Sequence, residues 1–428
     1  MERQADVVVV GGGIVGSATA YYLARRGVGV VLVERNEIAG EQSGRNWGFV
    51  RQQGRDPAEV PLMMESNRIW RGLEQELGAD IEWIQGGNLA LAATEERVAL
   101  FEQWLGTARE FGMDTRLVSP SEIQGLLPGM ARTWLGGLYT PSDGHAEPVK
   151  ATQALADAAV KHGARLYPRC AVEGIETEGG RVSGVRTEAG PVRARTVVCA
   201  AGAWSARVIR PLGLRLPQRW VRATVARTTP APPLTRAGVW SPAVSFRQRR
   251  DGTLNIAAAG AADHDITLQS FRHARLFLPN YWKNRKLFRF HLGRPLLRDV
   301  AGLLPGAAAG RRPLTWDRHL DPRPNPAKVR RSLAELHALY PSLGELAVTR
   351  SWAGYIDATP DAIPVVGEAG PPGLVLATGF TGHGFAMGPI VGRLVAELVT
   401  DGKPSLDLRP FRFSRFAEGA VGRPRSVL

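Results

Sequence analysis

The chain has 428 residues, 44% of them hydrophobic and 22% charged, and this composition predicts a soluble globular protein of two or three domains. Its two cysteines, Cys170 and Cys199, are too few for a disulfide framework or a metal cluster, so we expect a reducing compartment and no metal site. The formal net charge of +14 raises the question of nucleic-acid binding, but no nucleic-acid-binding module is visible, so we expect no nucleic-acid partner.

The chain opens with a strand, a glycine-rich turn and a helix. Ala5 to Val10 is mostly valine, which is typical of a buried parallel strand. Gly11, Gly13 and Gly16 follow in the spacing G-x-G-x-x-G, and Ser17 to Arg26 has helical character. The first glycine permits a tight turn, the second lets the backbone approach a pyrophosphate, and the third lets helix and strand pack closely.

An acidic residue completes this unit. Gly27 to Val33 predicts a second strand, and Glu34 stands at its end, eighteen residues after Gly16. A carboxylate there suits two hydrogen bonds from a ribose diol, and the N-terminus of the helix offers N–H groups and partial positive charge to phosphates. The complete arrangement predicts a dinucleotide-binding domain, with a glycine-rich turn that binds no ligand as the alternative.

Helices and strands then alternate along the chain. We expect a loop at 41–55, helices at 61–77, about 94–112, from 120, and 148–162, and strands at 81–91, 136–140, 164–177, 182–188 and 194–200. From 218 to about 315 the strands become longer around hairpin turns such as Asp251-Gly252. A helix at 327–339, a strand at 374–377, a glycine-rich loop at 379–388 and a helix at 390–400 follow, so we expect the C-terminal segment to fold back onto the nucleotide-binding domain.

Further motifs carry a family resemblance. They are Val10 to Gly16, Glu34, the run Cys199 to Trp204, Pro360-Asp361 with Pro364 to Gly367, and Gly379 to Phe385. Over roughly residues 5 to 416 the sequence resembles the D-amino-acid oxidase and sarcosine oxidase superfamily of FAD-dependent amine oxidoreductases. The motifs together are specific for FAD and for an amine substrate class, but not for one substrate.

The resemblance implies a fold and a division of the chain. The fold class is α/β, with a Rossmann-like FAD-binding domain of the glutathione-reductase type and a second, mostly antiparallel-sheet substrate domain. We expect the FAD-binding domain at 1–85, 145–217 and 330–416, the substrate domain at 86–144 and 218–329, and a tail at 417–428.

The resemblance also implies which residues bind FAD. With the opening unit included, the set is Gly11, Gly13, Ile14, Val15, Gly16, Glu34, Arg35, Ser43, Gly44, Val172, Ala201, Gly202, Trp204, Gly354, Gly382, His383 and Gly384. Gly202 is expected against the isoalloxazine and ribityl chain, the backbone of Val172 beside adenine, and Gly382 to Gly384 along the pyrimidine edge of the flavin. An ordinary turn after a strand is the alternative for Gly202.

The substrate site follows from the same resemblance. Arg51 resembles the arginine that grips the substrate carboxylate in sarcosine oxidases, and a planar guanidinium suits a carboxylate because it donates two parallel hydrogen bonds. Arg45 and Arg55 are competitors, and a solvated loop arginine is the plain alternative. Tyr355 is a second catalytic candidate, with a core tyrosine as its alternative.

Two histidines occupy motif positions. His383, also counted among the catalytic candidates, is expected to shape the flavin loop rather than to act as a base. A neutral amine can deliver hydride from its α-carbon to flavin N5 without a strong side-chain base, so the protein mainly orients the donor. His145 stays a weaker candidate for the pocket.

Departures from the family pattern bear on the reaction. Ala386 stands where monomeric sarcosine oxidase has a lysine that also holds the carboxylate. Asn255 stands near the place of a lysine that promotes reaction with dioxygen, which favours a dehydrogenase. No cysteine or histidine occurs in 350–355, where that group attaches its flavin, so we expect noncovalent FAD.

The segment 266–298 is basic and rich in aromatic residues. It has eight basic residues and no acidic one, interleaved with aromatics such as Phe271, Trp282 and Phe290, while Pro279 interrupts any single long helix. It is either a solvated surface whose aromatics face the core, or a docking patch for anionic lipid or an electron-accepting partner. The sequence shows no signal peptide and no apolar run near the ~20 residues that span a membrane, so we expect a cytoplasmic protein. If the patch docks on lipid, we expect the protein to be peripheral at the inner face of the membrane.

The sequence therefore predicts FAD-dependent oxidation of a small amino acid or N-substituted amino acid, namely a D-amino acid, sarcosine or a proline-like compound, at its C–N bond. Hydride would pass to flavin N5, and a dehydrogenase using a quinone or an electron-transfer protein is favoured. The alternatives are an oxidase that uses oxygen and makes hydrogen peroxide, and an FAD-binding subunit of a larger dehydrogenase complex.

Overall fold

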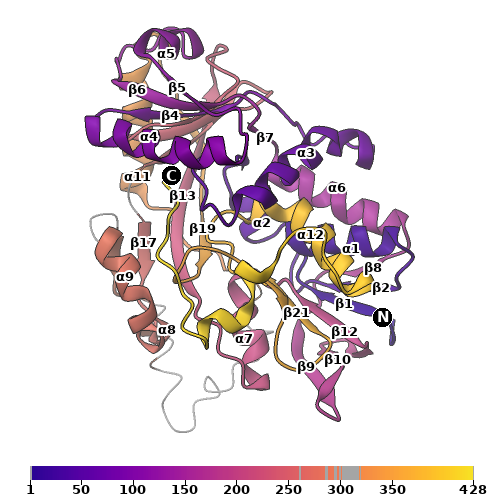
Figure 1. The fold of residues 1–428 in the computed structure, drawn as a ribbon. Helices are drawn as coiled ribbons and strands as arrows, with labels where there is room; N and C mark the ends of the chain where they lie inside the picture. The colour runs from indigo at the N-terminus through magenta and orange to yellow at the C-terminus, as the bar shows by residue number, and fades with distance from the viewer. Residues whose placement is uncertain are drawn as a thin grey trace.

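The computed structural model of the chain describes residues 2–259, 262–284, 288–293, 296–297, 300, 318 and 320–427. Its strands form two large sheets, and its helices cover them on separate faces (Figure 1). Within these residues, none of the helices combines the length and the apolar character needed to cross a bilayer.

The first large sheet contains the opening strand. Its six strands lie in the order β20-β21-β12-β1-β2-β8 and pair in parallel, except for the antiparallel edge strand β20. Their bounds are β1 Val7–Val10, β2 Val30–Val33, β8 Arg165–Tyr167, β12 Thr196–Cys199, β20 Val365–Glu368 and β21 Leu374–Thr378. Three of them, β1, β2 and β21, are buried along their whole length, as apolar strands covered on both faces must be. The predicted α/β class with a Rossmann-like fold is confirmed.

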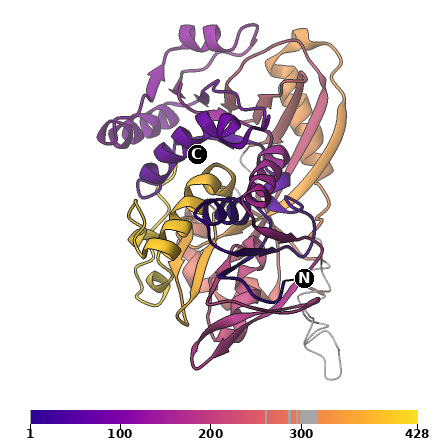
Figure 2. The same ribbon diagram turned by 90° about the vertical axis from the view of Figure 1, so that its right-hand side faces the viewer.

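Three helices cover one face of this sheet: α1 Ile14–Arg25, α6 Pro148–Lys161 and α12 Gly384–Asp401. Helices α1 and α12 cross closely, because a Cβ on Gly392 would lie 2.5 Å from the Cβ of Ala18. Figure 2 shows this pair from the side, with yellow α12 next to indigo α1. The C-terminal segment thus folds back onto the opening unit, as predicted, and α3 Val60–Leu77 packs against α12 in turn.

The other face of the sheet is covered by a small antiparallel sheet. Its order is β11-β10-β9, with β9 Val172–Glu178, β10 Arg181–Thr187 and β11 Gly190–Arg193. Buried valines from both sheets form one core cluster there, to which α7 Ser205–Ile209 contributes. Short 3-10 helices complete this part of the structure. Those after β12 are η1 Gly202–Trp204 and η2 Arg210–Leu212, and those after α12 are η5 Arg409–Phe411 and η6 Phe413–Phe416.

The second large sheet has ten strands and is mostly antiparallel. They are β4 Asn88–Ala92, β5 Arg116–Val118, β6 Gly136–Thr140, β13 Arg219–Pro230, β14 Gly238–Trp240, β15 Val244–Gln248, β16 Thr253–Ala258, β17 Ala262–Asp265, β18 Phe288–His291 and β19 Val348–Ala358. The helices α4 Glu95–Glu110, α5 Pro120–Leu126 and α11 Pro326–Leu339 and the short η4 Pro341–Leu343 accompany it. The long pairing of β13 with β19 runs from Arg219↔Ala358 to Thr228↔Val348 and directs the end of β19 toward the first sheet. The predicted boundaries between the two domains stay a prediction.

Several local predictions were wrong. The predicted loop at 41–55 contains α2 Gln42–Arg45 and β3 Phe49–Val50, which pairs with β7 Gly144–His145. The predicted strand at 81–91 forms only from Asn88, since only an isolated bridge at Ile84 precedes it. Helix α12 begins at Gly384 rather than near 390, and Pro389 lies inside it as its sixth residue, where proline cannot donate the N–H that would pair with the carbonyl of Phe385.

The basic segment also differs from its prediction. It forms α8 Leu268–Arg272 and α9 Ala274–Asn284, so the helical break falls at His273, while Pro279 lies inside α9. Part of the predicted range 218–315, including Arg285, Lys286, Arg294 and Arg298 of the basic segment, lies outside the described residues.

Candidate active site

A cavity of about 430 Å³ lies where the two large sheets approach each other. Its lining comes from the turn between β1 and α1, the segment 40–55, the turn after β12, the end of β19 and the start of α12. The carboxyl ends of β1, β2 and β12 meet at this place, which is where open parallel sheets bind their ligands.

The glycine turn leaves room along one side of the cavity. Gly11 has φ +111°, and a Cβ on it would lie 2.5 Å from the carbonyl oxygen of Ala200. A Cβ on Gly16 would lie 1.9 Å from the carbonyl oxygen of Gly11. Gly11 and Gly13 line the cavity, so here a ligand can approach the backbone without meeting a side chain.

Helix α1 directs its N-terminus at this side of the cavity. Gly13 is its N-cap and offers no side chain, while the N–H of Ile14 donates to Ser43 Oγ at 2.8 Å. Ile14, Val15 and Ser43 line the cavity. The unpaired N–H groups of a helix N-terminus and its partial positive charge favour a phosphate here.

Glu34 lies buried at the end of β2 and also lines the cavity. One carboxylate oxygen accepts the N–H of Gly12 at 2.6 Å, and the other accepts the N–H of Asn36 at 2.7 Å. Burial raises the pKa of Glu34, and these two backbone donors oppose that rise. The carboxyl group is therefore fixed in place beside the glycine turn, within reach of a bound nucleoside.

Arg35 follows Glu34 and stacks on a tryptophan. Its guanidinium carbon lies 3.6 Å from the ring centroid of Trp204, which lies in η1 after β12. Arg35, Trp204, Val172, Ala201 and Gly202 all line the cavity. The structure thus brings together predicted residues from three parts of the chain at the nucleotide end.

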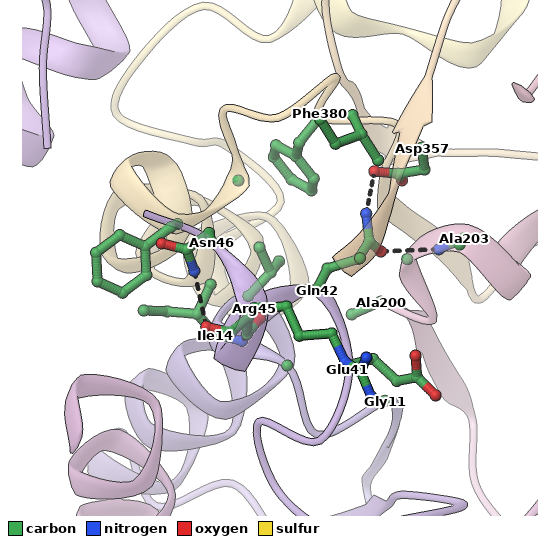
Figure 3. Close-up of a pocket in the computed structure, with 18 of the residues that line it drawn as sticks. Gly11, Ile14, Glu41, Gln42, Arg45, Asn46, Ala200, Ala203, Asp357 and Phe380 are labelled. Atoms are coloured by element: carbon green, nitrogen blue, oxygen red, sulfur yellow. Dashed lines mark hydrogen bonds between the residues drawn. The ribbon is translucent and has the colours of Figure 1, made fainter. Parts of the chain in front are cut away.

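Gln42 and Asp357 connect the two sides of the cavity, and the sequence analysis missed both. The amide Nε2 of Gln42 donates to Asp357 Oδ1 at 2.8 Å, and its Oε1 accepts the N–H of Ala203 at 3.0 Å (Figure 3). Asp357 Oδ2 accepts the N–H of Gly379 at 2.8 Å, and burial raises the pKa of this carboxyl. Asp357 shares a strand face with Tyr355, two residues earlier, which is the signal that could have revealed it.

Two buried arginines occupy another part of the lining. Arg51 is 5% exposed and donates from Nη1 to the carbonyl of Gln53. Arg55 is 2% exposed and donates from Nε to the carbonyl of Arg51 at 3.0 Å. Its Nη1 is buried and has no hydrogen-bond partner within the described parts of the chain. A buried donor without a partner is costly, so Arg55 offers an open position for an acceptor.

Two carboxyl groups, Glu59 and Asp143, lie close enough to this pair to act on its charge. Burial holds the pKa of Arg51 well below its ordinary value, and the charge of Arg55 acts in the same direction. Asp143 accepts N–H groups from Gln52 and Gln53, yet burial raises the pKa of Asp143 to about 7. An anionic ligand at the arginines would stabilise their charged forms.

His383 stands just before α12 beside the arginines. Its Nδ1 lies 3.0 Å from Glu59 Oε2, and Glu59 is fully buried. Burial lowers the pKa of His383 to about 4, with the charge of Arg55 acting in the same direction. His383 is therefore neutral at physiological pH, which agrees with a role in shaping the loop.

The competing arginine, Arg45, is engaged elsewhere. Its Nη1 donates to Asp321 Oδ1 at 2.6 Å and to the carbonyl of Ala353 at 2.9 Å. Tyr355 lines the cavity, and its hydroxyl donates to Asp265 Oδ2 at 2.8 Å. Because its guanidinium is engaged with Asp321 and Ala353, Arg45 is a weaker candidate for binding the carboxylate. Tyr355 remains part of the cavity lining.

Three aromatic rings line the cavity near Arg51, and the sequence analysis did not single them out. The centroids of Trp47 and Phe49 each lie 5.1 Å from that of Trp240, which belongs to β14. The guanidinium carbon of Arg51 lies 5.0 Å from the Trp240 centroid. These residues are far apart in the sequence: Trp240 lies on β14, which pairs with β4, and Phe49 packs against Gly238 of the same strand.

Four predicted site residues lie outside the lining. Gly16 and Gly44 do not face the cavity; their missing side chains make room for the carbonyls of Gly11 and Ala39 instead. His145 is buried between the carbonyl of Arg236 and the guanidinium of Arg247. Asn255 accepts a hydrogen bond from Arg227 Nε at 3.2 Å on β16 and does not line the cavity.

The sequence model of the FAD dependent oxidoreductase family, DAO, matches residues 6–398. The chain belongs to this family and is a FAD-dependent oxidoreductase. Across 99% of its length it is 28% identical to all of the glycine oxidase of Geobacillus kaustophilus strain HTA426. It is also 27% identical, over 99% of its length, to the mitochondrial sarcosine dehydrogenase of Mus musculus, of which it spans 42%.

Among solved structures, the L-amino acid deaminase of Proteus myxofaciens in complex with anthranilate superposes with a TM-score of 0.89 at 29% identity. The alignment covers 97% of this chain and 94% of that one. The chain thus spans about two fifths of the mitochondrial sarcosine dehydrogenases of Mus musculus and Homo sapiens and the whole of the glycine oxidase.

The cavity fits FAD. The glycine turn and the N-terminus of α1 would hold the pyrophosphate, and Glu34 would hold the ribose of the adenosine. A Cβ on Gly202 would lie 2.3 Å from Gln42 Oε1, and its φ of +49° favours glycine, so the turn after β12 can come close to a flat ring.

Proposed function

We propose that the protein oxidises an amino acid at its C–N bond, in the class of D-amino acids, sarcosine and proline-like compounds, and gives an imine that water hydrolyses. The arginine pair Arg51 and Arg55 is the observation that carries this proposal. Bound FAD supplies the two-electron acceptor for the hydride of the α-carbon.

The charges of the site support a carboxylate as the recognised group. Two buried guanidinium groups face the cavity, and one of them has an open donor. Ala386 has only a methyl group and cannot donate to a carboxylate, whereas Arg55 lines the cavity with an open donor and would make the second contact. Arg51 and Arg55 would thus hold one carboxylate between them, as charge-assisted donors do.

The neutral state of His383 supports hydride transfer without a strong side-chain base. His383 has a pKa of about 4 and donates to Glu59, so it takes no proton near neutral pH. The role of the chain is to orient the amine: the arginines hold the carboxylate, and Gly382 to Gly384 leave the approach to the flavin open.

An anaerobic titration tests the proposal. Protein saturated with FAD is mixed with D-amino acids, L-amino acids, sarcosine and proline, and the flavin band is followed. Bleaching by at least one amino acid, with the corresponding oxo acid as product, supports the proposal. If none of them bleaches the flavin, the proposal is contradicted, and the chain is better explained as a non-catalytic subunit of a larger complex.

Matched arginine variants test the carboxylate site. Arg51→Lys and Arg55→Lys should each lower kcat/KM by about 100-fold, because a lysine cannot make the paired contact. Arg45→Lys is the control, since its guanidinium is already engaged with Asp321, and it should keep kcat/KM within about threefold. Equal losses in all three variants would contradict the assignment.

For the electron acceptor we propose a quinone or an electron-transfer protein rather than oxygen. Among the described residues that line the cavity none is a lysine; the basic ones are Arg35, Arg45, Arg51, Arg55 and His383. Stopped-flow mixing of the reduced protein with air tests this: slow reoxidation supports a dehydrogenase, and fast reoxidation with hydrogen peroxide supports an oxidase.

We also propose that FAD is held noncovalently. Cys170 and Cys199 are buried outside the cavity lining, and burial raises the pKa of the Cys199 thiol to about 11, which leaves it unreactive. Acid precipitation should release all the flavin into the supernatant, and yellow precipitate would contradict this.

For the basic segment we propose docking on an anionic membrane surface. Phe271 on α8 and Trp282 on α9 are 64% and 57% exposed, and Arg272 and Arg275 stand beside them as exposed cations. Apolar rings among arginines suit a bilayer with anionic headgroups.

Vesicle binding tests this proposal. Vesicles with 30% phosphatidylglycerol should retain the protein at low salt, while the double variant Phe271→Ser, Trp282→Ser should not be retained. Retention of that variant, or binding only to a protein acceptor, contradicts the proposal. Leu135→Ser, exposed on another surface, is the control.

A further inference from the structure

The aromatic rings Trp47, Phe49 and Trp240 form one wall of the cavity beside the arginines, and we call them the aromatic wall. Trp47 and Phe49 lie in and around β3, and Trp240 ends β14. Their centroids are 5.1 to 5.9 Å apart. All three line the cavity, so together they present an apolar surface to whatever occupies it.

Contacts behind the wall hold the rings in place. Trp240 donates from Nε1 to Asn88 Oδ1 at 3.0 Å. Phe49 packs closely against Gly238, because a Cβ on that glycine would lie 2.3 Å from Phe49 Cε1. The carbonyl of Trp47 accepts a hydrogen bond from the buried Arg247. A surface fixed in this way is ready to receive a ligand without ordering it first.

The aromatic wall lies next to the two arginines that we propose bind the carboxylate. The guanidinium carbon of Arg51 lies 5.0 Å from the centroid of Trp240. In an α-amino acid the carboxylate and the side chain are both bonded to the α-carbon. A carboxylate held by Arg51 and Arg55 therefore places the side chain within reach of the rings.

The charges exclude a cation as the occupant of the wall. Aromatic rings bind ammonium groups as well as apolar groups. Here one face of Trp240 already lies against Arg51, and the buried Arg55 adds a second positive charge. A further cation would be repelled, whereas an apolar side chain gains from contact with the rings.

We infer, on the basis of the proposed function, that the substrate carries a large apolar side chain on its α-carbon, and that this side chain binds the aromatic wall. Whichever enantiomer is used, this favours amino acids such as phenylalanine and leucine over sarcosine and glycine, which have no side chain to place there.

A substrate comparison tests the inference. Rates with a dye as acceptor are measured for both enantiomers of phenylalanine and leucine, and for sarcosine, glycine and glutamate. The better phenylalanine enantiomer should exceed sarcosine in kcat/KM by at least about 100-fold, since each methylene in an apolar pocket contributes a factor of about 10 to 200. A ratio near one, or a preference for glutamate, overturns the inference; no reduction of the flavin by any amino acid overturns the proposed function itself.

Variants of the wall separate a substrate contact from a flavin contact. Gly238→Ala should push Phe49 aside, and Trp47→Leu should remove one ring; each should lower the ratio of phenylalanine to sarcosine by at least about tenfold. The flavin spectrum and the affinity for FAD should stay unchanged. Equal loss with both substrates, or weaker FAD binding with an unchanged ratio, overturns the inference. Gly106→Ala, on α4 with no atom within 4 Å of the added Cβ, is the matched control and should keep the ratio.

Discussion

His383 and Glu59 form a buried hydrogen bond between the loop before α12 and the residue that precedes α3, with Nδ1 of His383 3.0 Å from Glu59 Oε2. The pair lies beside Arg51 and Arg55, and Glu59 is a nearby negative charge for both arginines. One carboxylate thus holds the histidine in place and offsets part of the positive charge in the cavity.

Glu59→Gln should have opposite effects on stability and on ligand binding. Loss of a buried charged acceptor should lower the free energy of unfolding by about 2 kcal/mol. The arginines lose a competing negative charge, so benzoate, a carboxylate probe, should bind at least about threefold more tightly. Titration of the flavin band with benzoate and urea unfolding measure the two effects.

The control for this variant lies on the same helix. Glu76 pairs with Arg25 on the surface of α3, away from the cavity. Glu76→Gln should change the free energy of unfolding by no more than about 0.5 kcal/mol and leave benzoate binding unchanged. Weaker benzoate binding by the Glu59 variant would show that its charge is not coupled to the arginines.

The glycine turn makes a second prediction. Gly16→Ala places a Cβ 1.9 Å from the carbonyl oxygen of Gly11, which is part of the backbone and cannot move freely. The variant should be recovered without FAD or not recovered folded. Gly72→Ala on α3, where no atom lies within 4 Å of the new Cβ, should be more stable than the wild type by up to about 1 kcal/mol. Absorbance of the purified proteins and their Tm values measure both, and a normally yellow Gly16 variant contradicts the prediction.

Local patterns predicted the nucleotide end of the site well. The valine strand, the glycine spacing and Glu34 lie within 34 consecutive residues, and each depends on its immediate neighbours. The structure accordingly places most of them around one cavity. The exceptions, Gly16 and Gly44, have a packing role that spacing alone does not distinguish from contact with a ligand.

The substrate end could not be predicted in the same way, because it depends on pairings between distant segments. Gln42 and Asp357 are 315 positions apart, and Trp240 lies on β14, whose partner strand β4 is distant in the sequence. Arg55 was a candidate, but its open donor and the engagement of Arg45 with Asp321 become visible only in the folded chain. The sequence predicted the residue types, and the tertiary contacts decide their roles.

A buried ion pair near the C-terminus makes a third prediction. Arg415 donates from Nε and Nη2 to the two oxygens of Asp361, and both residues are buried. Arg415→Met should lower the free energy of unfolding by about 3–5 kcal/mol, because it leaves a buried carboxylate without its partner. Adding Asp361→Leu should recover part of this loss.

The exposed pair of Arg409 with Asp407 is the control for this prediction. Its arginine side chain is 87% exposed, so Arg409→Met should change the free energy of unfolding by no more than about 0.5 kcal/mol. Urea unfolding of the four proteins measures the difference. A double variant that is less stable than Arg415→Met alone would contradict the proposed cost of the unpaired carboxylate.

His145 makes the protein sensitive to acid. It is fully buried, with Nε2 3.2 Å from the carbonyl oxygen of Arg236 and Nδ1 facing the guanidinium of Arg247, so only the neutral ring fits. Burial, with the charge of Arg247 in the same direction, lowers the pKa of His145 from 6.5 to about 3. Above pH 6.5 the ring is neutral in both the folded and the unfolded chain. Below it the unfolded chain binds a proton that the folded chain does not, so stability is lost as the pH falls from 6.5 toward 3.

Between pH 6.5 and pH 4 this histidine should account for a loss of about 3 kcal/mol in the free energy of unfolding. His145→Gln retains an amide that can donate to Arg236 but does not titrate, so its free energy of unfolding should fall by about 3 kcal/mol less over that range. His162→Gln, at an exposed position, is the control and should follow the wild type. Urea unfolding with saturating FAD at pH 7, 5.5 and 4 measures the three slopes, and equal slopes for His145→Gln and the wild type would show that the ring accepts its proton in the folded protein after all.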